Sequence, residues 1–224
     1  MKKVIGLIVM LLVILISFSG CAKVNYEVEI NKDGSGKITY IYGISKEKLG
    51  DSKDLVEQFV ETMKEQAEEN DYTVEIYEDE KNSGFIANKH IENLSEDFSL
   101  EEVFGEEYVK DTENNKINIE KDFWKTKYFQ NAKLDLTNLK DTNIEMVYRI
   151  KLPVNSKINN ATERTEDGKT LTWNLKSGEI NSVEFVAEET NILPITIITI
   201  VVLVAMVLVV LLILKKKSVT KNEN

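Results

Sequence analysis

The fold is decided by the stretch Val24-Asn-Tyr-Glu-Val-Glu-Ile30, Asn31-Lys-Asp-Gly-Ser-Gly36 and Lys37-Ile-Thr-Tyr-Ile-Tyr-Gly-Ile44. Its first part alternates apolar and polar residues, with Val24, Tyr26, Val28 and Ile30 on one face, as in a half-buried β-strand. The middle part is rich in residues that form turns, and the last part is again rich in β-formers. Together they predict a β-hairpin.

A long amphipathic helix is predicted after this hairpin, between Asp51 and Glu69. Asp51 or Ser52 is a suitable N-cap. Apolar residues recur at helical spacing along this segment, namely Leu55, Val56, Phe59, Val60, Met63 and Ala67. Because such a helix has one apolar face, we expect it to cover one face of a sheet.

Further strands are predicted downstream, with one short helix at Ser95–Phe104 capped by Ser95. The β-rich runs are Tyr72–Tyr77, Gly84–Ile91, Tyr108–Lys110, Lys116–Ile119, Thr126–Leu136, Asn143–Leu152, Thr170–Leu175 and Ser182–Glu188. Many strands joined by tight turns around one long helix indicate an α+β domain with a mainly antiparallel sheet.

The N-terminus has the features of a bacterial lipoprotein export signal. Two lysines precede a short apolar run, and Phe18-Ser-Gly-Cys21 follows it. A basic segment, an apolar segment and small residues before a cut are typical of a secretory signal. In a lipoprotein, the cysteine thiol takes a diacylglycerol carrying fatty acids such as palmitate, so Cys21 is the predicted lipidation site. Phe18 replaces the usual leucine, and an uncleaved signal anchor is the alternative.

The C-terminal segment is predicted to span a membrane. No charge interrupts the run from Ile192 to Leu214. At about 1.5 Å per residue this run reaches about 34 Å, enough to cross a hydrocarbon core of about 30 Å. Three lysines follow from Lys215, and the positive-inside rule places them in the cytoplasm. Because a spanning helix retains a protein more firmly than one acyl chain, Cys21 is expected to orient the domain.

These features predict four segments in a protein of the bacterial cell membrane. Residues 1–21 form the signal peptide and 22–190 the extracytoplasmic domain. Residues 191–214 form the transmembrane helix, and 215–224 form a cytoplasmic tail. Six of the 28 basic and one of the 38 acidic residues lie in the two terminal segments, which leaves 22 against 37, a balance of −15. Such an acidic domain repels phosphate backbones, so nucleic acid is not an expected partner.

No catalytic residue, cofactor or metal site is predicted. Asn31 to Ile38 copies the front of a calcium-binding EF-hand loop, but Tyr42 stands where the final glutamate belongs, so a plain hairpin loop is expected. The single Cys21 excludes an intramolecular disulfide, and the single His90 excludes a pair of histidine ligands to zinc. A hydrolase with a hidden carboxylate pair would need two acids to converge in a cleft.

The aromatic residues are the remaining candidates for a binding site. They are Phe123, Trp124, Tyr128, Phe129, Tyr148 and Trp173. Such side chains line ligand cavities in many proteins, and they equally fill cores.

The order of motifs resembles that of the LppM-like bacterial lipoproteins. It consists of the Cys21 lipobox, the Val24–Ile30 strand with its Asp33-Gly-Ser-Gly36 turn, the late Asn160-Ala-Thr162 and Thr172-Trp-Asn-Leu-Lys-Ser-Gly178, and the terminal apolar helix with its lysine stop. The resemblance implies an α/β fold akin to lipid-binding proteins and a role in binding lipid or glycolipid at the cell envelope. No functional residue carries over beyond Cys21.

Two functions follow as hypotheses. The first is a non-enzymatic module that binds a lipid or glycolipid at the membrane, held there by the Cys21 lipid and the C-terminal helix. The second is a structural or accessory protein of an envelope complex, whose protein partners the sequence does not name.

Overall fold

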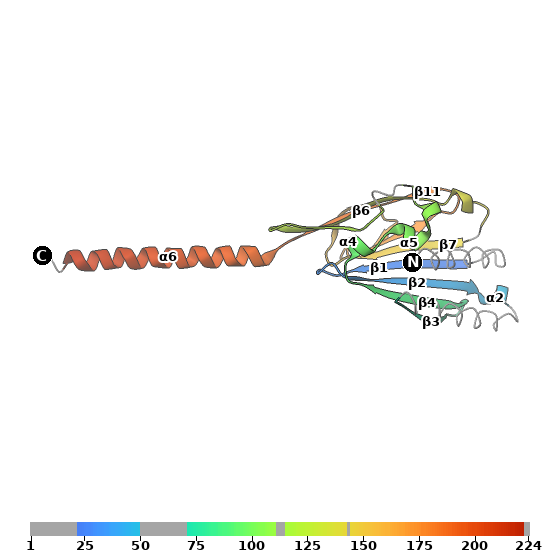
Figure 1. The fold of residues 1–224 in the computed structure, drawn as a ribbon, viewed down its shortest axis with the longest axis horizontal. Coiled ribbons are helices and arrows are strands. Elements are labelled where there is room, and N and C mark those ends of the chain that lie inside the picture. The colour runs from blue at the N-terminus through green and yellow to red at the C-terminus, as the bar shows by residue number, and fades with distance from the viewer. Residues whose placement is uncertain (1–21, 50–70, 111–114, 143, 222–224) are drawn as a thin grey trace. The chain divides into compact units, whose positions relative to one another are not determined.

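The computed structural model describes residues 22–49, 71–110, 115–142 and 144–221 (Figure 1). The chain divides into two compact units. Unit 1 comprises the described residues up to Ile119 together with Lys127–Glu188, and unit 2 comprises Glu120–Thr126 together with the residues from Glu189 onward.

The larger sheet, sheet A, has seven strands in the order β3-β4-β2-β1-β7-β10-β9. The bounds in that order are β3 Tyr72–Glu78, β4 Asn82–Ile91, β2 Gly36–Ser45, β1 Ala22–Ile30, β7 Ile144–Lys151, β10 Thr170–Leu175 and β9 Glu163–Arg164. The predicted hairpin is confirmed, because β1 and β2 pair antiparallel with Val28 opposite Ile38. One pair is parallel, since β1 lies alongside β7 with Tyr26 opposite Tyr148. The prediction of a mainly antiparallel sheet therefore holds with this exception.

The smaller sheet, sheet B, has four strands in the order β5-β6-β11-β8. Their bounds are β5 Asn118–Lys121, β6 Lys125–Asp135, β11 Ile180–Thr190 and β8 Ser156–Asn159. The strands β8 and β9 were not predicted from the sequence. Both are short and largely polar, so they carry little of the alternation that marks a half-buried strand.

Three predictions for the segment between β4 and β6 are wrong in detail. The single helix at Ser95–Phe104 is two short helices, α4 Leu94–Asp97 and α5 Leu100–Phe104. Asn93 is the N-cap of α4, because its Oδ1 atom accepts a hydrogen bond from the Ser95 backbone amide at 3.2 Å. The strand at Tyr108–Lys110 is a 3-10 turn, η1 Glu106–Tyr108, followed by an isolated bridge from Val109 to Leu134. The predicted strand at Lys116–Ile119 begins two residues later, at Asn118.

The two sheets bury a common core with α4 and α5 (Figure 1). Val24, Tyr26, Val28 and Ile30 are all buried, as the alternation in β1 predicts. Leu134 on sheet B and Leu100 on α5 are fully buried in the same cluster. Two short connecting elements, α2 Lys46–Leu49 and η2 Thr137–Leu139, complete unit 1.

The fold is therefore a mixed α+β fold dominated by β-sheet. The amphipathic helix predicted at Asp51–Glu69 falls largely at 50–70, outside the described residues. The long helix that the structure describes is α6, which runs from Ile192 to Lys221. It continues beyond the predicted boundary at Leu214 and includes the three lysines of the predicted tail.

Candidate functional site

Four aromatic side chains form a row across the inner face of sheet A. Strand pairing places Trp173 opposite Tyr148, Tyr148 opposite Tyr26, and Tyr26 opposite Tyr40. We call these residues the aromatic row. The Trp173 and Tyr148 ring centroids lie 5.9 Å apart, and those of Tyr26 and Tyr40 lie 5.3 Å apart. Phe104 of α5 packs on Tyr26 and Tyr148 at 4.4 and 5.8 Å. The row thus crosses four adjacent strands within one packed layer.

The aromatic row runs from the sealed core toward an exposed edge. Trp173, Tyr148 and Tyr26 are buried, whereas Tyr40 is only half-buried. The Tyr40 ring centroid lies 5.8 Å from that of Tyr72 on β3, the strand at the edge of sheet A. The same inner face therefore changes from core to surface within a few strands.

The exposed end combines apolar surface with one positive charge. Ile76 on β3 is 59% exposed and lies opposite the buried Phe85 on β4. The Lys89 ammonium group lies 5.2 Å from the centroid of the Tyr72 ring, a cation–π arrangement. We call Tyr72, Ile76 and Lys89 the β3 edge. An apolar surface beside a cation suits a ligand with an apolar part and a polar or anionic part.

A buried hydroxyl on the same face has no hydrogen-bond partner among the described residues. Tyr42 lies opposite Phe85, and their rings stack with centroids 5.5 Å apart. Its hydroxyl oxygen is buried and unpaired, and burial raises the Tyr42 pKa. A buried polar group without a partner costs about 1–3 kcal/mol. This hydroxyl is therefore an unused donor inside the packed layer.

One buried polar contact of the core joins the two sheets. The Tyr148 hydroxyl donates to Gln130 Oε1 on β6 at 3.3 Å, and Gln130 Nε2 donates to the Asn115 carbonyl oxygen at 3.5 Å. Burial raises the pKa of Tyr148, so this hydroxyl stays protonated and remains a donor. The contact with Gln130 bonds Tyr148, an inner member of the aromatic row, to sheet B.

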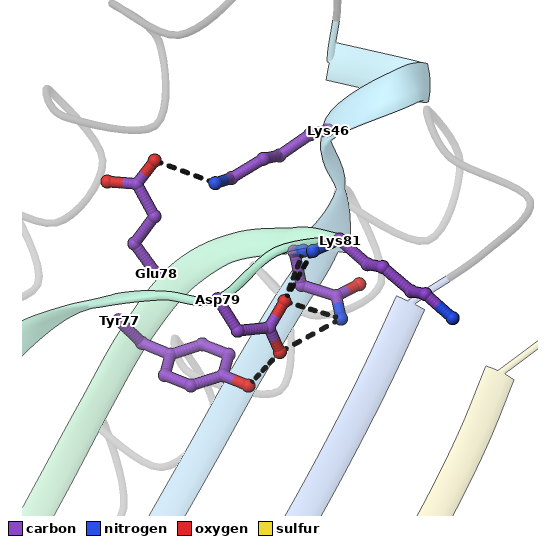
Figure 2. A network of polar contacts seen from close by, with 6 residues as sticks. Lys46, Tyr77, Glu78, Asp79 and Lys81 are labelled. Carbon is purple, nitrogen blue, oxygen red and sulfur yellow. Dashed lines mark hydrogen bonds and ion pairs between the residues drawn. The ribbon is translucent and has the colours of Figure 1, made fainter.

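A polar network holds the turn between β3 and β4 (Figure 2). The Asp79 carboxylate accepts hydrogen bonds from the Tyr77 hydroxyl and from the backbone amides of Lys81 and Asn82, the two amides at 2.8 and 2.6 Å. These hydrogen bonds lower the pKa of the Asp79 carboxyl well below its usual range. The bond from the Tyr77 hydroxyl has the largest effect, and the two backbone amides follow. The same hydrogen bond raises the pKa of Tyr77 to about 12.

The network also ties β3 to the end of β2. Lys46 Nζ lies 2.8 Å from a Glu78 carboxylate oxygen, and its backbone amide donates to the Lys81 carbonyl oxygen at 2.8 Å. These groups are largely exposed, so we assign them a positioning role: they keep the edge strand in register beside β4.

The residues predicted from the sequence lie in different places. Tyr128, Tyr148 and Trp173 belong to the core, whereas Phe123 and Trp124 are exposed. The remaining aromatic of that set, Phe129, lies beneath the Lys127 ammonium group at 4.5 Å. Tyr26, Tyr40, Tyr42 and Tyr72 are not among the residues predicted from the sequence to form a binding site, although Tyr26 is on the predicted buried face of β1. The missing signal was strand register, which brings these rings together.

The loop that resembles part of an EF-hand, His90 and the predicted lipidation site Cys21 lie at separate places in the chain. The loop after β1 is a hairpin turn, in which Asp33 Oδ1 accepts from the Ser35 backbone amide at 3.0 Å. Among the described residues, no three histidine, cysteine, aspartate or glutamate side chains form a metal-binding group. His90 is an exposed residue of β4. Cys21 lies outside the described residues, immediately before β1.

The chain enters and leaves unit 1 at opposite ends of the strands. At the start of β1, Ala22 pairs with Ile144, whose carbonyl oxygen accepts from Ser177 Oγ. The next residue, Gly178, donates its amide to the Leu136 carbonyl oxygen, just after the end of β6. The Leu136 amide also donates to the Glu179 carbonyl oxygen just before β11, so β11 reaches Glu188, the last residue of unit 1, at the opposite end of the strands. At about 3.3 Å per residue, β1 alone separates its ends by about 26 Å.

Unit 2 joins a hairpin tip to the long helix. Asn191, the residue before α6, donates from Nδ2 to the Asp122 carbonyl oxygen at 2.8 Å and from its backbone amide to the Trp124 carbonyl oxygen at 2.8 Å. Its Oδ1 atom accepts from Thr126 Oγ1 at 3.1 Å. The turn between β5 and β6 is thus bonded to the residue directly before α6.

Helix α6 is apolar and exposed. In the described part of the chain it is the one helix long and apolar enough to cross a membrane, and the segment Pro194–Leu211 has no buried residue. The Thr196 and Thr199 hydroxyls donate to the carbonyl oxygens four residues earlier, at 3.0 and 2.8 Å. The hydroxyls in its first turns are therefore satisfied within the helix, as an apolar surrounding requires.

Comparisons with known proteins give two findings. The sequence matches the LppM domain family over residues 23–189. The fold is similar to the NMR structure of the folded domain of LppM from Mycobacterium tuberculosis, with 15% sequence identity and a TM-score of 0.48. That match covers 76% of this chain and 91% of the other. No curated protein matches the sequence significantly.

Proposed function

The chain belongs to the LppM domain family, and from this premise we propose that it is a membrane-anchored envelope lipoprotein whose domain binds a lipid or glycolipid. In this proposal the domain holds its ligand and catalyses no reaction. The aromatic row and the β3 edge form the binding face, and the C-terminal helix holds the protein in the membrane.

One observation carries the binding proposal: the inner face of sheet A is continuous from the buried Tyr26 to the exposed Ile76. An acyl chain that lies along Ile76 and Phe85 removes apolar surface from water, which contributes about 25 cal/mol per Å². Lys89, whose ammonium group lies over the Tyr72 ring, supplies a positive charge for a head group. A lipid with an anionic head group matches both features.

The anchoring proposal is supported by the exposure of α6. Its large apolar residues from Ile195 to Leu211 are between 41% and 61% exposed. Such a surface is stable in lipid but costly in water, where contiguous apolar patches this large are rare on soluble proteins. In this proposal the lysines after Leu214 lie at the cytoplasmic face and the domain lies outside.

The lipid on Cys21 then has a geometric role. Because the chain enters and leaves unit 1 at opposite ends of the strands, a lipid at Cys21 and a helix that starts at Ile192 restrain opposite ends of the domain. If both insert in one leaflet, the domain is held at the membrane at two points. Such a placement brings a lipid-binding face within reach of its ligand.

The lipid content of the purified protein tests the binding proposal. The full chain is purified in detergent, and the lipid that remains bound is measured by native mass spectrometry. We expect Ile76→Asp to lose a bound lipid that the parent protein retains, because a carboxylate in the apolar face opposes an acyl chain. Ile158→Asp is the matched control, since Ile158 is 67% exposed on β8 of the other sheet. Equal lipid content in all three proteins would contradict the proposal.

A further inference from the structure

The hairpin turn of unit 2 carries an exposed pair of aromatic side chains that is not part of the proposed binding face. Phe123 and Trp124 are 60% and 49% exposed. Their ring centroids lie 4.9 Å apart, and the ring planes are nearly perpendicular at 89°. Two large rings that pack edge to face on each other at a turn form a rigid apolar tip.

The turn beneath this pair is fixed by hydrogen bonds. Asp122 Oδ1 accepts from the backbone amides of Trp124 and Lys125, both at 2.7 Å. The Asp122 amide donates to the Lys125 carbonyl oxygen at 2.9 Å. The backbone that presents the two rings therefore has little freedom.

The tip is also fixed to the start of α6 by Asn191. Its three hydrogen bonds reach Asp122, Trp124 and Thr126, so they bracket the aromatic pair on both sides. Asn191 directly precedes Ile192, the first residue of the helix. The hairpin tip therefore lies beside the first turn of α6.

We propose that Phe123 and Trp124 insert into the lipid head-group layer on the extracytoplasmic side. There they form an interfacial anchor beside the start of α6. Each head-group layer is about 5–7 Å thick, so a tip bonded to the residue before the helix lies within it. Tryptophan is enriched at this depth, where its ring has an apolar and a polar side. Lys125 is exposed beside the pair and is suited to lipid phosphate.

This anchor has a consequence for orientation. A helix alone allows the domain to rotate about the helix axis, because one point of attachment fixes no direction. A second contact at the hairpin tip fixes the face that unit 2 turns toward the membrane. The inference rests on the spanning role proposed for α6.

Trp124 fluorescence in vesicles tests it. The chain has two tryptophans, so Trp173→Phe leaves Trp124 and Trp124→Phe leaves Trp173 as sole reporters. Each full-length variant is reconstituted in vesicles of phosphatidylcholine and phosphatidylglycerol that carry a nitroxide quencher, either at a shallow or at a deep position of the acyl chain. We expect the shallow quencher to reduce Trp124 emission more than the deep one, and neither to reduce Trp173 emission.

Controls separate this inference from the proposal that α6 anchors the protein. Flotation of the vesicles reports insertion of the helix. Floating protein whose Trp124 emission no lipid quencher reduces would overturn the hairpin anchor alone, and protein that fails to float would overturn both. If Trp173→Phe does not fold, the quenching of Trp124 is obtained as the difference in quenching between the parent protein and Trp124→Phe. Phe123→Asp is expected to reduce the quenching of Trp124, whereas Ile158→Asp leaves it unchanged.

Discussion

The side-chain amide of Asn191 donates a hydrogen bond to the backbone carbonyl oxygen of Asp122 at 2.8 Å, across 69 residues of sequence. This bond joins the residue before the long helix to a turn that carries two exposed aromatic rings. Because it is made by a side chain, a single substitution removes it and leaves the backbone intact. The coupling between hairpin and helix is therefore open to direct measurement.

Asn191→Ala is expected to loosen the hairpin turn. It removes the side-chain bonds to Asp122 and Thr126, each of which contributes about 0.5–1.5 kcal/mol. Amide hydrogen exchange of residues 120–126 should become faster, with little change in sheet A. Asn181→Ala is the matched control, because Asn181 likewise makes several side-chain bonds to backbone groups, at the turn before β11. Unchanged exchange in the hairpin of Asn191→Ala would contradict the proposed coupling.

Tyr42→Phe is expected to stabilise the lipid-free protein by about 1–3 kcal/mol, because it removes a buried hydroxyl that has no partner among the described residues. Tyr148→Phe is the comparison, since that hydroxyl donates to Gln130 and its loss should destabilise by about 0.5–1.5 kcal/mol. Denaturant unfolding monitored by circular dichroism measures both changes. If Tyr42 contacts the ligand, the same substitution also lowers lipid retention. Equal destabilisation by the two substitutions would show that the Tyr42 hydroxyl has a partner in solution.

The Asp79 turn should respond to acid. Its folded-state pKa lies below the ordinary value of 3.8, so its contribution to stability is complete above that value and declines as the pH falls through the folded-state pKa. The difference in unfolding free energy between the parent protein and Asp79→Asn should therefore shrink as the pH falls from about 5 to about 2. Denaturant unfolding over that range measures it. A difference that stays constant with pH would show that the carboxylate charge is not involved.

Cys21→Ser is expected to remain in the membrane fraction after alkaline extraction. A spanning helix holds a protein effectively permanently, whereas a single acyl chain binds reversibly. The variant should instead differ in how its domain is presented, measured as altered protease accessibility of the loops in intact cells. Recovery of Cys21→Ser in the soluble fraction would show that α6 is not the anchor.

The part of the fold that the sequence predicts is the part with local periodicity. Alternation in Val24–Ile30 places Tyr26 in the core, and the turn residues that follow fix the hairpin with β2. The run of uncharged residues from Ile192 marks α6 in the same way. These signals are contained in neighbouring residues, so a single sequence is sufficient to recognise them.

The proposed binding face was not predictable in this way. It depends on β1 pairing in parallel with β7, and on β10 pairing next to β7, which together align Tyr26, Tyr148 and Trp173. Register between strands far apart in the sequence is set by the packing of the whole sheet and not by local pattern. Likewise, nothing in the sequence near Asn191 indicates that it bonds to Asp122.

Photocrosslinking tests the central claim, that the inner face of sheet A binds lipid, most directly. Cells that express the full chain are grown with a fatty acid that carries a photoactivatable diazirine, irradiated, and the purified protein is mapped by peptide mass spectrometry. We expect lipid adducts on peptides that contain β3, at Tyr72 or Ile76, in addition to adducts on α6. Adducts confined to α6 and the hairpin tip, with none on β3 or β4, would contradict it.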